Sequence, residues 1–108
     1  MSQNNQSQNQ IRDVDRIIEG VRQAFPDVVV DQLKVTHPAD DDGLWYFRLP
    51  ENPKDDIQIE SSYGNCPFLI ENMRNDDRKS GESVEQVVSI ICEYFREGRE
   101  SGSFEREA

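Results

Sequence analysis

A cysteine thiol, an imidazole and several carboxylates are the groups of this chain that could carry out nucleophilic chemistry. Cys66 has the residue type of a nucleophile, with His37 as its base and an aspartate to orient the imidazole. No family-specific nucleophile signature surrounds Cys66, and the run Gly64-Asn65-Cys66-Pro67 is also typical of a tight turn with a small, buried cysteine. We therefore favour a structural role for Cys66 and keep a thiol-dependent enzyme as an alternative.

Three adjacent carboxylates offer oxygen ligands for calcium or magnesium, those of Asp40, Asp41 and Asp42. An EF-hand loop would need an aspartate where Pro38 stands and a glutamate where Leu49 stands. A solvated acidic loop is the favoured interpretation, and cation binding there stays open. The two cysteines and one histidine lack zinc-ligand spacing, and there is no glycine-rich phosphate loop, so we expect no metal and no cofactor.

The chain is strongly acidic, with 22 Asp and Glu against 12 Lys and Arg and a formal net charge of −10. Such a surface repels nucleic-acid phosphates and anionic lipids at long range, so neither is an expected partner. A basic protein fits better, although acidity also confers solubility alone. The chain lacks an apolar run of membrane-spanning length and the pattern of a signal peptide, so we expect a cytoplasmic protein with Cys66 and Cys92 reduced.

The elements that must position these groups form one domain over residues 11–95, between a disordered polar tail (1–10) and a flexible C-terminal tail (96–108). Apolar residues at helical spacing predict a first helix from Ile11 to Phe25, which ends before Pro26. A second helix is expected to begin at Ser83, with Gln86 at capping-box spacing, and to end near Gly98.

Between the helices, alternating apolar residues predict four strands near residues 28–36, 44–49, 56–60 and 68–73, followed by a charged loop over 75–82. The short connections favour antiparallel neighbours, so the order α-β-β-β-β-α predicts an α+β domain with a four-stranded antiparallel sheet and both helices on one face. The covered face is expected to carry Leu33, Val35, Trp45, Phe47, Leu49, Ile57, Ile59, Phe68 and Ile70. On the second strand, Leu44 and Tyr46 are the alternative inward set, and we choose Trp45, Phe47 and Leu49 because that set is larger.

This layout places loops 37–43 and 63–67 at one end of the sheet. Loops 50–56 and 74–82 lie at the other end, where the second helix would begin. Arg74, Arg78 and Lys79 near this helix start could hold an anion, but Asp76 and Asp77 lie among them, which favours an internal salt-bridge loop.

The uncovered face is polar with Leu44, Tyr46, Leu69 and Met73 interspersed, and tyrosine and methionine are enriched in interfaces. The alternative is a solvent-exposed face that binds no partner and carries a few apolar residues, which is common in proteins. The candidate binding surface combines this face with the acidic end loops: Tyr46, Arg48, Leu69, Glu71, Asp40, Asp41, Asp42, Tyr63 and Asn65.

The run Ile57-Gln-Ile-Glu-Ser-Ser-Tyr-Gly-Asn-Cys-Pro-Phe-Leu-Ile-Glu71, followed by Ser83-Val-Glu-Gln-Val-Val-Ser-Ile-Ile91, resembles small acidic bacterial proteins of immunity-protein type. The resemblance covers residues 28–95 and implies a cytosolic α+β protein that neutralises a toxin by binding it. Our leading hypothesis is therefore a non-enzymatic protein-binding domain, such as an immunity-type inhibitor of a basic toxin. A homodimer formed through the uncovered face and the Cys66-dependent enzyme are the alternatives.

Overall fold

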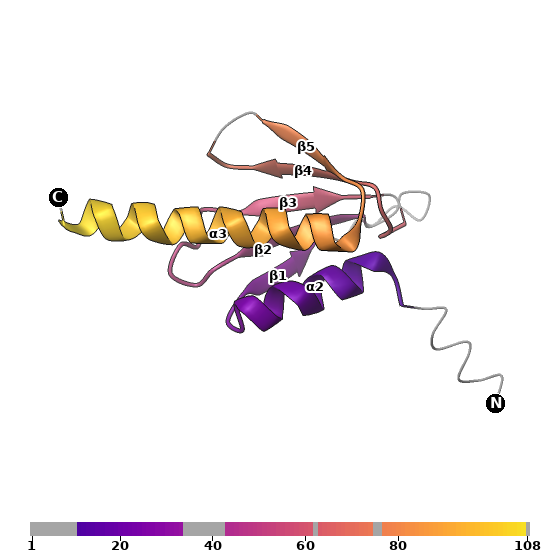
Figure 1. Cartoon of the computed structure of the whole chain (residues 1–108), viewed down its shortest axis with the longest axis horizontal. Helices are drawn as coiled ribbons and strands as arrows, with labels where there is room; N and C mark the ends of the chain where they lie inside the picture. Colours follow the sequence, from indigo (N-terminus) through magenta and orange to yellow (C-terminus); the bar gives the residue numbers. More distant parts are fainter. Residues whose placement is uncertain (1–10, 34–42, 62, 75–76, 108) are drawn as a thin grey trace.

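The chain folds into two helices packed on a five-stranded antiparallel sheet. A computed structural model describes residues 11–33, 43–61, 63–74 and 77–107, with side chains described up to Arg99. The elements follow each other along the chain as labelled in Figure 1: α2 (Asp13–Ala24), β1 (Val29–Gln32), β2 (Leu44–Arg48), β3 (Ile57–Glu60), β4 (Phe68–Asn72), β5 (Arg78–Gly81) and α3 (Val84–Glu107).

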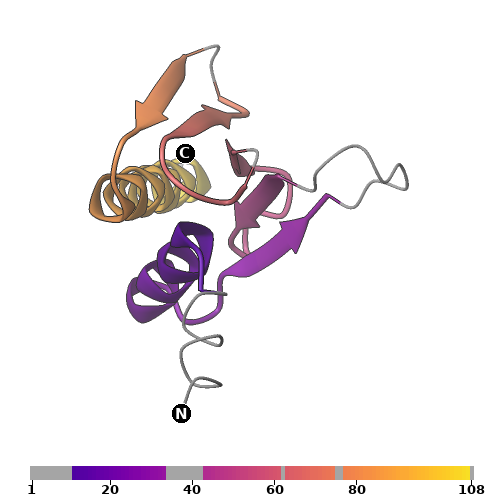
Figure 2. The ribbon, with the colours of Figure 1, turned by 90° about the vertical axis from the view of Figure 1, so that its right-hand side faces the viewer.

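Both helices lie on the same face of the sheet, which confirms the predicted two-layer α+β arrangement (Figure 2). The strands are in sequence order, and every neighbouring pair is antiparallel. Alternate residues of the middle strands point toward the helices. The covered face and the helices form one core that includes Val14, Ile17, Val21, Trp45, Phe47, Leu49, Ile57, Ile59, Phe68, Ile70, Val87, Ile91 and Phe95. The choice of Trp45, Phe47 and Leu49 as the inward set is thereby confirmed.

Helix α2 carries the predicted apolar stripe, and Val14, Ile17 and Val21 are fully buried. It ends at Ala24, because Pro26 disfavours helical geometry at the residue before it. Ile11, which the spacing assigned to the stripe, precedes the helix and is 50% exposed. Neither helix of the described chain has the long apolar run that crossing a membrane would require.

The sheet has a fifth strand, β5, where the sequence predicts a charged loop. β5 pairs with β4, with Arg78 opposite Glu71 and Gly81 opposite Phe68. The residues that precede Gly81 in β5 are polar or charged, and their side chains are exposed. The sequence of this strand therefore has no alternation of apolar residues that could have predicted it. Charged edge strands of this kind are common, since they discourage pairing with other chains. The prediction of four strands is therefore wrong.

Because β5 reverses the chain once more, α3 begins at the end of the sheet that holds residues 63–67, not at the end predicted. At its start, Gln86 N donates to Ser83 Oγ (3.1 Å), while Gln86 Oε1 accepts from Glu82 N (2.8 Å). The helix continues through Gly98 to Glu107, so the helix end expected at Gly98 is also wrong. The flexibility of residues 96–108 stays a prediction, and residues 1–10 lie outside the described chain.

In β1, the alternate residues that face the core are the opposite set from the one predicted. Val30 lies opposite Phe47 and packs against the core, whereas Leu33 is 46% exposed. The sequence offered apolar residues in both phases, and pairing with β2 selected the phase of Val28 and Val30. Val35, also expected in the core, lies outside the described residues.

Candidate binding surface

The uncovered face of the sheet is made by the strand residues that alternate with the core set. It comprises Val29, Asp31, Leu44, Tyr46, Arg48, Gln58, Glu60, Leu69, Glu71, Arg78 and Ser80, as the cross-strand pairs show. The candidate residues Tyr46, Arg48, Leu69 and Glu71 all lie on it. The sequence thus predicted this face for β2, β3 and β4 and missed the contributions of β1 and β5.

Ion pairs and hydrogen bonds link the strands across the uncovered face. Arg48 Nη1 lies 2.6 Å from Asp31 Oδ2 and joins β2 to β1. Glu71 Oε1 accepts from Gln58 Nε2 (2.9 Å), and Glu71 Oε2 lies 2.6 Å from Arg78 Nε. The charged groups of Arg48 and Glu71 are therefore already paired within the sheet, so they are not the groups most available to a partner.

An open hollow of about 500 Å³ lies on the uncovered face, at the end where α3 begins. Its apolar lining comes from Leu33, Leu44, Pro67 and Leu69. Glu60 also lines it, and the Glu60 carboxylate has no ion pair within the part of the chain that the structure describes. The hollow was not predicted from the sequence, because Leu33 was expected in the core. The sequence does show that residues 33, 44 and 69 are all leucine, but only the register of the strands shows that these side chains lie together.

Asn65 has a structural role at the start of α2. Its Oδ1 accepts from Asp13 N (2.9 Å), Asp13 Oδ2 accepts from Cys66 N (2.9 Å), and Val14 N donates to Gly64 O (2.9 Å). These bonds satisfy N–H groups that the first turn of a helix leaves without intrahelical partners. Tyr63, in the same turn, is 78% exposed. Asp40, Asp41, Asp42 and His37 lie outside the described residues.

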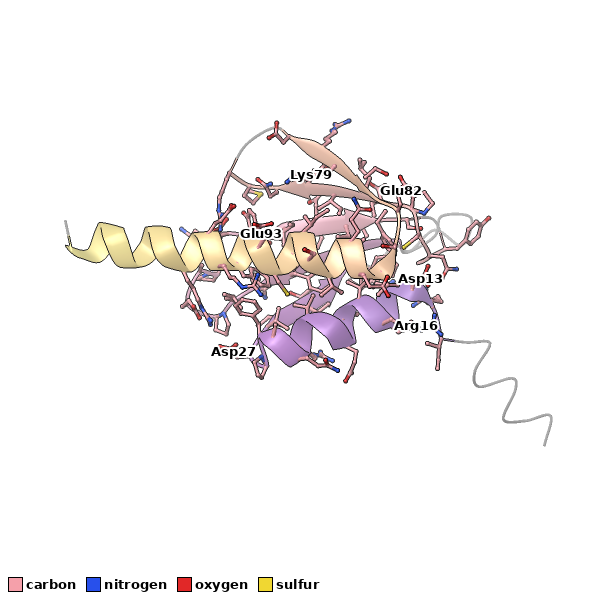
Figure 3. All side chains as sticks on the ribbon, in the orientation of Figure 1. Asp13, Arg16, Asp27, Lys79, Glu82 and Glu93 are labelled. Carbon is pink, nitrogen blue, oxygen red and sulfur yellow. The ribbon has the colours of Figure 1, made fainter. Side chains whose placement is uncertain are left out.

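Cys66 lies in a half-buried position beside Asp13, near the first turn of α3 (Figure 3 shows Asp13 and Glu82). Burial raises the pKa of the Cys66 thiol to about 11, and the carboxylate of Asp13 acts in the same direction. A catalytic thiolate requires the opposite shift, toward a lowered pKa. Cys66 and Cys92 are both free thiols, and Cys92 is buried in the core. These features support a structural role for Cys66.

In a Cys92→Ser background, we expect Cys66 to react with iodoacetamide far more slowly than free cysteine at pH 7. The raised pKa keeps most of the thiol protonated, and the rate should keep rising as pH approaches 11. Replacing Asp13 by asparagine keeps an acceptor for Cys66 N but removes the charge. The pKa should then fall, with about tenfold more thiolate for each unit. A rate at pH 7 equal to that of free cysteine would contradict the structural assignment.

At the other end of the sheet, Arg74 is the centre of an internal polar cluster. Arg74 Nη2 lies 2.8 Å from Asp55 Oδ2 and donates to Tyr94 O (2.9 Å), and its guanidinium lies 3.6 Å from the centre of the Tyr94 ring. The Tyr94 hydroxyl donates to Asp55 Oδ1. Burial, and then this bond to a carboxylate, raise the pKa of Tyr94. Arg74 therefore forms its ion pairs outside the expected salt-bridge loop, and Arg78 and Lys79, expected in the same loop, lie in β5. Tyr94 of α3 is a member of the cluster that the sequence did not indicate.

Comparison with known proteins adds no assignment to this surface. No family model matches the chain, and it has no match among the curated proteins or the solved structures. Among the described residues, no group of three or more His, Cys, Asp or Glu side chains is arranged to hold a metal ion. The functional argument therefore rests on the geometry of the uncovered face.

Proposed function

We propose that this chain is a non-enzymatic protein-binding domain that binds a basic protein through its uncovered face. The hollow lined by Leu33, Leu44 and Leu69 is the observation that carries the proposal. Leu33 is 46% exposed and Leu69 is 38% exposed, although the sheet has a second face that buries its apolar residues completely. Apolar side chains gathered in a hollow and bordered by polar residues are typical of a protein interface.

Charge favours a basic partner over a second copy of the chain. Each copy carries a formal charge of −10, so two copies repel each other on approach. Glu60 lies at the hollow, where a lysine or arginine of a partner would find a carboxylate beside an apolar surface for its aliphatic stem. A homodimer through the same face is the alternative, and a shift in sedimentation with concentration would reveal it.

The resemblance to immunity proteins supports a toxin as the partner within this proposal. Inhibition would then follow from occupation of the toxin's surface, and it requires no chemistry from the chain itself. The raised pKa of Cys66 is consistent with a binding role.

The proposal predicts that a photo-crosslinking residue placed at Leu69 in the cell captures a basic protein, whereas the same residue at Ser89 does not. Ser89 is exposed on α3, on the other side of the molecule, and serves as the matched control. The crosslinked partner is identified by mass spectrometry. Capture of a second copy at Leu69 would establish the homodimer instead, and a basic protein captured only at Ser89 would overturn the choice of face.

Once the captured protein is purified, Leu69→Ala is expected to raise the Kd of the complex about tenfold. This is the effect of removing one interface side chain that makes a moderate contribution to the binding free energy. The variant should keep the thermal stability of the parent, because Leu69 is already exposed. Association should also slow as ionic strength rises, since opposite charges steer the encounter.

A further inference from the structure

A small pocket lies between α3 and the strands β4 and β5, on the face of the sheet that the helices cover. It exists because α3 crosses the middle of the sheet, so that the edge strand β5 extends beyond the layer of helices (Figure 2). Its volume is about 100 Å³. A site for one water needs only about 10–15 Å³, so this pocket has room for a group of several heavy atoms.

The floor of the pocket is apolar, whereas most of the remaining lining is polar. Ile57 and Ile70 are 1% and 2% exposed, and Ile90 of α3 lies beside them. Tyr94 lines one side, where its hydroxyl is held by Asp55 and its ring lies against Arg74. Because Ile57 and Ile70 are almost fully covered, this apolar floor is small, and it has room for only a short aliphatic group.

Two opposite charges lie at the mouth of the pocket without pairing. Lys79 comes from β5, and Glu93 comes from the side of α3 that lines the pocket (Figure 3). Neither side chain forms an ion pair or hydrogen bond with any residue that the structure describes, whereas the ion pairs elsewhere close at 2.5–3.9 Å. Arg74, also at the mouth, is paired with Asp55 and Glu97, and Asp77 has an interaction of its own.

We propose that this pocket binds a free α-amino acid with a short aliphatic side chain, such as alanine or valine. The ligand carboxylate would lie at Lys79, its ammonium at Glu93, and its side chain against Ile57, Ile70 and Ile90. A ligand with only one charge is less suited, because an amine would approach Lys79 and a carboxylate would approach Glu93. A zwitterion satisfies both groups at once, and its charged ends can stay at the open mouth while only the side chain enters.

The test is a titration of the full chain with L-valine, followed by the methyl NMR signals of Ile70 and Ile90. Two probes of the same shape separate the charges: 3-methylbutanoate lacks the ammonium, and 2-methylpropylamine lacks the carboxylate. We expect millimolar binding of L-valine and at least fivefold weaker binding of either probe. Lys79→Gln and Glu93→Gln should each weaken valine binding by about fivefold, the upper range for one exposed ion pair.

Arg78→Gln is the matched control, because Arg78 precedes Lys79 but lies on the uncovered face with Glu71. It should leave valine binding unchanged. The absence of any shift at Ile70 and Ile90 in the parent chain would overturn the proposal, as would equal binding of 2-methylpropylamine or 3-methylbutanoate. These outcomes do not involve the uncovered face, so they leave the proposed protein-binding function untouched.

Discussion

Replacing Arg74 by leucine is expected to lower the free energy of unfolding by about 2 kcal/mol, between the values for an exposed and for a buried charge pair. The side chains of Arg74 and Asp55 are 29% and 27% exposed, so both charges are partly shielded from water. Among the described residues, the variant would leave the Asp55 carboxylate with only the Tyr94 hydroxyl as a close side-chain partner. It would also lose the bond to Tyr94 O and the cation–π contact with the Tyr94 ring. Urea unfolding followed by circular dichroism measures the change.

Arg78→Leu is the control for this experiment. Arg78 also forms an ion pair, with Glu71 at 2.6 Å, but its side chain is 70% exposed. We expect the free energy of unfolding to fall by less than about 1 kcal/mol, because water screens the attraction in such exposed ion pairs. A double-mutant cycle of Arg74→Leu with Asp55→Asn should show a coupling above about 1 kcal/mol. Equal losses for Arg74→Leu and Arg78→Leu would show that the cluster at Arg74 does not stabilise the fold.

Gly81→Ala is expected to destabilise the protein by about 2 kcal/mol through overpacking. Gly81 is buried where β5 leads into α3, and a methyl group there would collide with Val87 Cγ2 and lie 3.2 Å from Ile70 Cδ1. Val87 and Ile70 are both core residues with 0% and 2% exposure, so neither can move into solvent. Differential scanning calorimetry should show a clear drop in Tm.

Two further variants test the cause of this loss. Ser80→Ala, at the preceding exposed position of β5, should change stability by less than about 0.5 kcal/mol. Val87→Ala removes the atoms that collide, so the double variant Gly81→Ala/Val87→Ala should lose less stability than the sum of the single variants. An additive double variant would show that Gly81 is not in contact with Val87, and the position assigned to β5 would then be wrong.

The candidate site was predictable in part. Tyr46, Leu69 and Glu71 alternate with strongly apolar neighbours, so their place on the uncovered face followed from the pattern of each strand. The hollow did not follow, because its lining needs Leu33 and Leu44 to meet across two strands. Asn65 was predicted for the binding surface, but it caps α2, a contact between residues far apart in the sequence.

The sequence by itself determined the α+β class, the presence of both helices and the inward residues of β2, β3 and β4, because the larger apolar set of each of these strands lies in one phase and the connections between them are short. Only the tertiary structure decided the rest. β5 has no apolar pattern, and it is a strand because β4 offers it an edge to pair with. In β1, either of two alternate sets of apolar residues could have faced the core, and pairing with β2 selected one of them. Gly98 lies inside α3 and does not end it, and a Cβ at this position would collide with the side chain of Arg74, a contact that only the tertiary structure shows.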